Sequence, residues 1–348
     1  EGIIESLSSL PEEYFADIQL VSLSTTLATN ACVENKFSRG RLVLIGYDVE
    51  LLTMLRIRYG LPDIDEMILI PGGHSQQGQV LSIPDWNLLK KQIEKVNAET
   101  DAYGVVEYWG IRNAEFEQEA KKLIRQWTGK PVVCAHELSS EINSLRRAST
   151  TLLNAGLIKL IDDLLNSVKE GLSRMGITAP VMIVRGDGTM MSESFARERP
   201  VETLLSGPAA SVVGGMQLTG CSDALILDIG GTTSDLAVIR TGLTVLSEEG
   251  VDIGSWRTGT KAIKIRTIGL GGDSIISFDA NEQLQIGPRK ATPLSWLACH
   301  APEIKKELKR IHEENKWHSI SLAEFLYMVS RPDNTERFTQ EEQDIIKA

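Results

Sequence analysis

The stretch ALILDIGGTTSDLAVI, residues 224–239, carries the most information about the fold. Two apolar runs flank a turn that contains two aspartates, two glycines and three hydroxyl residues. Glycines let backbone N–H groups approach a phosphate, and threonine hydroxyls add donors. The same pattern is also typical of a plain β-hairpin, with glycines at positive φ and aspartates forming the turn. Spacing alone favours the phosphate turn only slightly.

The commoner phosphate-binding motifs do not occur. The chain lacks the lysine of a G-x-x-x-x-G-K-[ST] loop and shows no strand–GxGxxG–helix order. Asp228 and Asp235 supply the hard carboxylate oxygens that Mg²⁺ prefers, usually through water. A phosphate-binding turn within a β-hairpin therefore indicates an architecture different from those of the commoner motifs.

Composition narrows the class of protein. The 348 residues, 42% of them hydrophobic, suffice for one large domain or two ordinary ones. A net charge of -11 argues against nucleic acid or an anionic membrane as the main partner, because both would repel the chain. No apolar run approaches the roughly 18 residues of a membrane span. Four scattered cysteines without a CxxC pair indicate reduced thiols, so we expect a soluble, cytoplasmic protein.

β-rich runs alternate with helical patterns, which predicts an α/β fold with largely parallel sheets. The predicted strands are 18–24, 41–47, 66–72, 102–109, 131–138 and 180–188. The clearest predicted helix is 154–175, with Gly176 as its C-terminal cap.

A change in composition at residue 206 indicates two lobes, 1–205 and 206–348. The small residues of SGPAASVVGGM, which starts at Ser206, suit either a hinge between lobes or ordinary close packing. After residue 300 the chain becomes helical and charged, and we expect a solvated helical excursion there.

Three segments in order resemble the second lobe of the superfamily that unites actin, sugar kinases and heat-shock chaperones. They are SGPAASVVGG (206–215), LILDIGGTTSDLAVI (225–239) and TIGLGGDSIISF (267–278). A closer resemblance is to the hydantoinase A and oxoprolinase family. It rests on STTLATNACVE (24–34), ELSSEINSLRRASTTLLNA (137–155), RERPVETLLSGPAA (197–210) and QIGP (285–288). The resemblance implies a two-lobed actin-like fold, related to ribonuclease H, with mixed β-sheets flanked by helices.

The resemblance also implies an activity, the ATP-dependent opening of a cyclic amide such as a hydantoin or 5-oxoproline through phosphorylation of the amide oxygen. ATP and Mg²⁺ are the implied cofactors. Carried over to this sequence, the phosphate cradle is Gly230, Gly231, Thr232 and Thr233. Asp228 and Asp235 would act as the catalytic pair that orients Mg²⁺ or water, and Gly271, Gly272 and Asp273 would close the nucleotide side.

Several further residues are candidates for the cleft between the lobes. Thr25, Thr26 and Asn30 of STTLATN would face it in the first lobe, and Ser206 would do so in the second. The alternative for STTLATN is a helix N-cap made by Thr or Ser.

Arg146 or Arg147 could hold a substrate carboxylate or phosphate bidentately, although a helix-face salt bridge is the more common role of such residues. Asp187 ends a strand, as a cleft-facing acid or as a turn aspartate. His74 and His136 lack the H-E-x-x-H spacing, so we expect no zinc.

The chain departs from the family in two respects. The family's first phosphate hairpin and its adenosine-contacting loop have no counterpart here, so we expect a fragment with weak or no ATP turnover. After IGP, the segment with Arg289, Lys290 and Trp296 replaces a Gly/Pro-rich one, which puts the substrate in question.

Two other activities fit the same motifs. One is an ATP-dependent carboxylase subunit, and the other is a chaperone-like ATPase that reactivates a partner such as a corrinoid enzyme. A third alternative is a binding lobe without catalysis. For the hydrolase we expect a B-type hydantoinase subunit as partner, and an oligomer.

Overall fold

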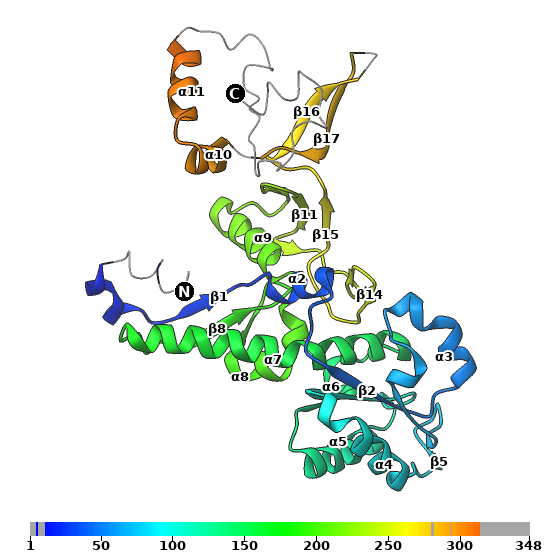
Figure 1. The fold of residues 1–348 in the computed structure, drawn as a ribbon. Coiled ribbons are helices and arrows are strands. Elements are labelled where there is room, and N and C mark those ends of the chain that lie inside the picture. The colour runs from blue at the N-terminus through cyan, green and yellow to red at the C-terminus, as the bar shows by residue number, and fades with distance from the viewer. Residues whose placement is uncertain (1–4, 6–10, 280–281, 293, 314–348) are drawn as a thin grey trace, which may run out of the picture. The chain divides into compact units, whose positions relative to one another are not determined.

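The computed structural model describes residues 5, 11–279, 282–292 and 294–313 (Figure 1). The chain divides into two compact units. The first unit comprises Glu1–Asp228 and Asp235–Thr267, and the second comprises Ile229–Ser234 and Ile268–Ala348. The segment that follows Ser206 belongs to the first unit, and the expected lobe boundary at 205/206 stays a prediction.

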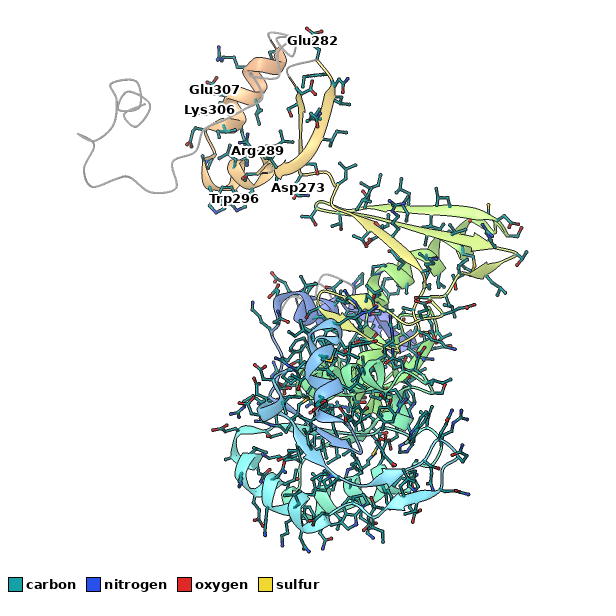
Figure 2. All side chains as sticks on the ribbon, turned by 90° about the vertical axis from the view of Figure 1, so that its right-hand side faces the viewer. Asp273, Glu282, Arg289, Trp296, Lys306 and Glu307 are labelled. Atoms are coloured by element: carbon teal, nitrogen blue, oxygen red, sulfur yellow. The ribbon has the colours of Figure 1, made fainter. Side chains whose placement is uncertain are left out.

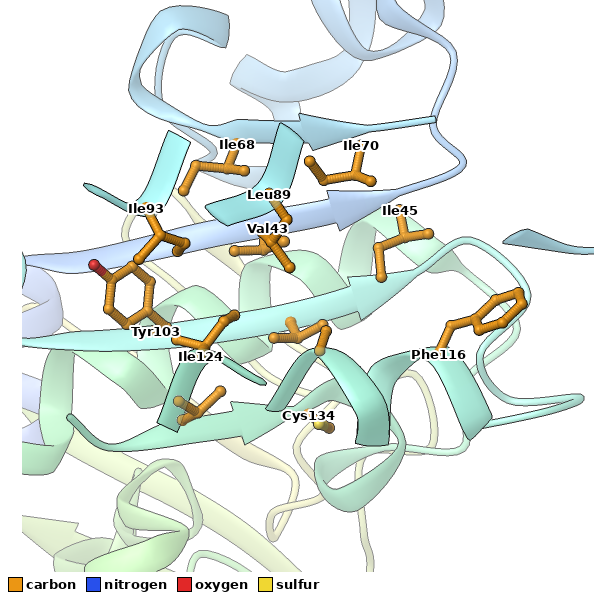
Figure 3. Close-up of a cluster of buried hydrophobic side chains, with 13 residues drawn as sticks. Val43, Ile45, Ile68, Ile70, Leu89, Ile93, Tyr103, Phe116, Ile124 and Cys134 are labelled. Atoms are coloured by element: carbon orange, nitrogen blue, oxygen red, sulfur yellow. The ribbon is translucent and has the colours of Figure 1, made fainter. Parts of the chain in front are cut away.

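The first unit contains a parallel four-stranded sheet in the order β3 (Ile68–Ile70), β2 (Gly40–Ile45), β6 (Ala102–Glu107) and β7 (Val132–Cys134). Side chains alternate along β2, so Val43 and Ile45 enter one core while Leu42 and Leu44 enter another. The first core is closed by α4 (Trp86–Val96) and α5 (Glu115–Thr128), as Figure 3 shows. The second core includes the start of α7 (Ser144–Arg174) and α3 (Val49–Leu55).

Helix α7 is 31 residues long and runs from this sheet to the next (Figure 1). It begins ten residues before the predicted helix, with the Asn143 side chain accepting from two backbone N–H groups. Its first turns are rich in Ser and Thr, which disfavour helix interiors. Here Thr150 and Thr151 donate to the carbonyls four residues back, so their hydroxyls are satisfied within the helix. Gly176 follows with φ of 72°, as expected for the residue after a helix.

A second sheet of the first unit has the order β1 (Val21–Leu23), β8 (Val181–Val184) and β9 (Met190–Ser192). β1 and β8 are parallel, whereas β8 and β9 are antiparallel. Its apolar side packs on the second half of α7 and on α8 (Glu193–Glu198).

The third sheet contains the hairpin of residues 224–239. Strands β10 (Ala224–Ile229), β11 (Ser234–Arg240) and β12 (Leu243–Thr244) are neighbours in that order, and β15 (Ile265–Ile268) pairs with β11. Helix α9 (Ser206–Thr219) packs on this sheet through Ala209 and Val212. A Cβ on Gly215 would lie 3.1 Å from the end of the Ile226 side chain, whereas a Cβ on Gly214 would meet no described atom within 4 Å. Close packing therefore bears on Gly215 but does not explain Gly214.

The other elements of the first unit are short. They are η1 (Glu12–Asp17), α2 (Leu27–Glu34), η2 (Arg56–Tyr59), η3 (Ile64–Glu66), β4 (Gly73–His74), β5 (Val80–Ser82), η4 (Asn97–Glu99), α6 (Ala135–Leu138), η5 (Pro200–Thr203), β13 (Asp252–Ile253) and β14 (Trp256–Arg257). The mixed sheets flanked by helices confirm the expected α/β class.

The second unit contains an antiparallel pair, β16 (Ser274–Phe278) and β17 (Leu284–Lys290), followed by α10 (Leu294–His300) and α11 (Ile304–Glu313). Helix α11 confirms the expected helical segment over 304–313, and the rest of the expected excursion lies outside the described residues. Within the described part of the chain, no helix has the length and apolar character needed to cross a membrane.

Candidate functional site

The turn between β10 and β11 is closed by a hydrogen bond from the Gly230 N–H to the Thr233 carbonyl, at 2.9 Å. Neither Gly230 nor Gly231 has a φ in the left-handed region, so positive φ does not explain these glycines. A Cβ on Gly231 would meet no described atom within 4 Å. The turn is exposed, and the backbone at Gly231 is accessible to a ligand.

A second glycine loop docks on this turn within the second unit. The Gly272 N–H donates to the Gly230 carbonyl at 3.0 Å, and the Asp273 N–H donates to the Gly231 carbonyl at 2.7 Å. A Cβ on Gly271 would lie 2.4 Å from the Gly231 carbonyl oxygen, a distance that no side chain tolerates. The structure thus brings together the two segments that the family resemblance placed around the nucleotide.

Lys290, the last residue of β17, forms hydrogen bonds to both glycine loops. Its Nζ donates to the Thr232 carbonyl at 2.6 Å and to Asp273 Oδ1 at 2.9 Å. Asp273 lies directly before β16 (Figure 2). An ammonium group has three donors, so one N–H of Lys290 remains for a ligand. From the sequence, Lys290 is only a departure from the family, because no local pattern places it near residue 232.

The turn also offers side-chain donors. Within the described part of the chain, neither the Thr232 nor the Thr233 hydroxyl has a hydrogen-bond partner, and both residues are exposed. Two free hydroxyls, accessible backbone N–H groups and a lysine ammonium form a donor set that fits the oxygens of a phosphate.

Asp228 and Asp235, which lie in the first unit, have different surroundings. Asp228 is exposed on β10, and its carboxylate has no hydrogen-bond partner among the described residues. Asp235 on β11 accepts a 2.5 Å hydrogen bond from the Thr267 hydroxyl through Oδ1. Asp228 therefore has both oxygens available for a hydrated cation, while Asp235 has one oxygen engaged.

The candidate cleft residues Thr25 and Ser206 lie together although they are 181 positions apart. The Ser206 hydroxyl donates to the Thr25 carbonyl at 2.9 Å and accepts from the Thr25 N–H at 3.2 Å. Ser206 is fully buried, so it joins the starts of α2 and α9 rather than facing a ligand. The Thr26 hydroxyl accepts from the Asn30 amide at 3.4 Å. Thr26 is the N-cap residue of α2, but its side chain makes no capping hydrogen bond.

Arg147 is neither a ligand clamp nor a partner in a helix-face salt bridge. Its side chain is fully buried, and its two terminal nitrogens donate to four backbone carbonyls. These carbonyls belong to Glu141, Ile142, Glu107 and Tyr108. Because one planar guanidinium satisfies four carbonyls, Arg147 fixes the start of α7 to the end of β6.

Arg146 lines a polar surface cavity of about 700 Å³ and is largely committed to protein partners. Its Nη1 donates to the carbonyls of Glu249 and Thr258, at 2.6 and 2.9 Å, and lies 3.3 Å from the Asp252 carboxylate. Asp187 closes its own turn, because its Oδ1 accepts from both the N–H and the hydroxyl of Thr189. Turn formation therefore accounts for Asp187.

Comparisons with known protein families match two regions of the chain. A sequence model described as "Hydantoinase/oxoprolinase" matches residues 147–306, and one described as "Hydantoinase/oxoprolinase N-terminal region" matches residues 1–128. Together the two models cover most of the chain.

Individual proteins are also similar to this chain in sequence and structure. The chain is 28% identical to caprolactamase subunit alpha of Pseudomonas jessenii, over 86% of this chain and 45% of that protein. It is 24% identical to the acetophenone carboxylase gamma subunit of Aromatoleum aromaticum, over 55% of this chain and 27% of that protein. The crystal structure of ATP-dependent caprolactamase from P. jessenii is similar with a TM-score of 0.68 at 25% identity, over 83% of this chain and 44% of that one. The chain thus spans less than half the length of these relatives.

Proposed function

Because the chain belongs to the hydantoinase/oxoprolinase family, we propose that it is part of an ATP-dependent enzyme that opens a cyclic amide. The observation that carries this proposal is the interlocked pair of glycine loops at 230–233 and 271–273. Their exposed face presents the donors that a triphosphate requires. The relative named as an ATP-dependent caprolactamase supports the substrate class.

ATP use has a chemical reason. An amide carbon is a poor electrophile because the nitrogen lone pair delocalises into the carbonyl. Transfer of the γ-phosphoryl group to the amide oxygen releases ADP and makes that oxygen part of a phosphate leaving group. Water then adds to the carbon, the ring C–N bond breaks and inorganic phosphate leaves, so the sum is amide, ATP and water to amino acid, ADP and phosphate.

We assign the described residues the following roles in phosphoryl transfer. The backbone N–H groups of the turn, the hydroxyls of Thr232 and Thr233 and the free N–H of Lys290 bind phosphate oxygens and stabilise charge that develops on them. Asp228, which has both oxygens available, would hold Mg²⁺ together with Asp235. When bound, Mg²⁺ would add positive charge beside the phosphates to that of Lys290.

A partner subunit and an oligomeric enzyme belong to the proposal. The caprolactamase relative is named as an alpha subunit, which supports a second, B-type subunit that contributes to the reaction on the amide.

A carboxylase is the second candidate function. It is favoured by the similarity to an acetophenone carboxylase subunit. An ATP-dependent carboxylase would use the same phosphate turn.

One experiment separates the two. The whole protein and its partner subunit are incubated with ATP and Mg²⁺ and with caprolactam, hydantoins, 5-oxoproline, or a ketone plus bicarbonate, while ADP release is measured. Release that depends on a cyclic amide and yields the ring-opened product supports the hydrolase. Release that depends only on ketone and bicarbonate supports the carboxylase. If ADP release responds to none of these substrates, the proposed function fails.

A further inference from the structure

A group of buried polar side chains in the first unit lies away from the phosphate turn in sequence and is not used by the proposed function. Glu117 of α5, Cys134 at the end of β7 and His136 of α6 each place a potential metal-ligand atom within 4.8 Å of the other two. Figure 3 shows Cys134 at the end of its strand. The carboxyl ends of parallel strands are the usual location of ligands in α/β proteins.

The three side chains are held in position by their own hydrogen bonds. Glu117 Oε1 accepts from the Glu107 N–H at 2.8 Å, which leaves Oε2 for His136. That Oε2 accepts from the His136 N–H at 3.0 Å and contacts His136 Nδ1 at 2.5 Å. The Cys134 thiol is not part of a disulfide, and it donates to the Glu117 carbonyl at 3.2 Å.

A second buried pair repeats this pattern beside the first. Glu107 Oε1 accepts from the N–H of His74 at 2.6 Å and contacts its Nδ1 at 2.8 Å. Glu107 Oε2 is buried and has no partner among the described residues. A Cβ on Gly110 would lie 2.3 Å from Glu117 Oε1 and 3.2 Å from Glu107 Cβ, so both glutamates border the same point. Glu107 is thus a buried acid beside Glu117, with one oxygen that has no described hydrogen-bond partner.

Charge balance indicates the kind of ion. One carboxylate, one thiolate and one neutral imidazole neutralise a divalent cation, which suits a buried site. Mixed oxygen, sulfur and nitrogen ligands are typical of Zn²⁺ and of Co²⁺ in its place, whereas Mg²⁺ prefers oxygen alone. We propose that Glu117, Cys134 and His136 form a zinc-type metal site with Glu107 as a neighbouring buried acid.

One ligand pair, Glu117 and His136, is already close to coordination geometry. Two ligands bound to a tetrahedral ion lie roughly 3.3 Å apart, so the His136 ring would move away from Glu117 Oε2 by only about 0.8 Å. The His136 side chain is 20% exposed, which leaves an open direction for water as the fourth ligand. Three protein ligands and an open position are typical of a catalytic rather than a structural zinc site.

The metal must displace the thiol proton. Burial and the nearby carboxylates of Glu117 and Glu137 raise the pKa of the Cys134 thiol. A bound divalent ion deprotonates such a thiol directly. Zinc was not expected because no histidine has the H-E-x-x-H spacing, whereas the fold brings Glu117 to Cys134 from 17 positions away.

Cobalt titration of the full chain tests the site. The exposed Cys221 and Cys299 are first replaced by serine, so that only the buried Cys32 and Cys134 remain. We expect one Co²⁺ per chain and a thiolate-to-cobalt charge-transfer band in the near ultraviolet. Cys134→Ser should abolish the band, and His136→Gln should weaken cobalt binding at least about tenfold. Cys32→Ser is the matched control, because Cys32 is equally buried and lies in a different core, and it should leave the band unchanged.

Two results would overturn the site. One is the absence of a charge-transfer band at stoichiometric cobalt in the chain that retains Cys134. The other is a band that persists in Cys134→Ser. The cobalt titration of the chain that retains Cys134 needs no substitution among Glu117, Cys134 and His136. It therefore tests the metal site even if the variants of these residues do not fold.

Discussion

The Lys290 ammonium group forms an ion pair of 2.9 Å with the Asp273 carboxylate while it also donates to the carbonyl of Thr232. This arrangement places a cation on the phosphate turn from a residue 58 positions away. A charge-assisted hydrogen bond contributes roughly 1.5 kcal/mol or more, which corresponds to about tenfold in affinity.

Lys290→Met should therefore weaken ATP binding by about tenfold, as measured by calorimetric titration in the presence of Mg²⁺. Arg289→Met is the matched control, because Arg289 is an exposed cation next in sequence and should have little effect (Figure 2). Equal losses of ATP affinity in the two variants would mean that the total positive charge of β17, and not the position of Lys290, determines ATP binding.

Gly271→Ala should separate the two glycine loops, because its Cβ would lie 2.4 Å from the Gly231 carbonyl oxygen. Overpacking of this kind costs roughly 1–3 kcal/mol. We expect a lower thermal midpoint for the second unit and weaker ATP binding. Gly269→Ala is the control in the same loop, since a Cβ there meets no described atom within 4 Å. An unchanged Gly271→Ala protein would show that the loops do not interlock.

Arg147→Met should destabilise the first unit by about 1–3 kcal/mol, because it removes four hydrogen bonds of a fully buried guanidinium to carbonyls that are buried or partly buried. Chemical denaturation measures the loss of unfolding free energy. Arg147→Lys should recover only part of it, because an ammonium group cannot reproduce the planar donor set. A stable, folded Arg147→Met protein with impaired substrate binding would instead indicate a ligand role.

Glu137 should contribute stability that depends on pH. Burial alone would raise its pKa, but hydrogen bonds from Lys121 and from the Cys134 N–H outweigh burial and hold the pKa below its usual value. A carboxyl whose pKa is lower in the folded state stabilises the protein above its unfolded pKa of about 4.3, and this stability is lost as pH falls through the folded value. Glu137→Gln should therefore be less stable than the parent near pH 7, and the difference should shrink below about pH 4. A difference that is independent of pH would exclude this account.

The parallel sheet, helix α7 and the β10–β11 hairpin were predictable because each has a local signal of apolar periodicity or turn residues. Boundaries were less predictable. The run predicted as strand 131–138 turns helical after Cys134, where Glu137 accepts from the Cys134 N–H and starts α6. A capping contact of this kind competes with strand propensity.

Roles that depend on burial could not be predicted from local sequence. Ser206 and Arg147 have the chemistry of ligand-binding residues, but both are fully buried by segments distant in the chain. Lys290 and Asp273 are 17 positions apart, and their contact requires the β16–β17 pairing. The approach of Gly271 to the turn followed only from resemblance to the family, because no periodicity links residues 231 and 271.

The central claim is that the turn at 230–233 binds the phosphates of ATP. The most direct test is a crystal structure of the whole protein with Mg²⁺ and a non-hydrolysable ATP analogue. The account predicts phosphate density within hydrogen-bond distance of the backbone N–H groups of the turn, of the Thr232 or Thr233 hydroxyl and of Lys290 Nζ. Nucleotide bound with its phosphates elsewhere, and the turn without contact to them, would contradict it.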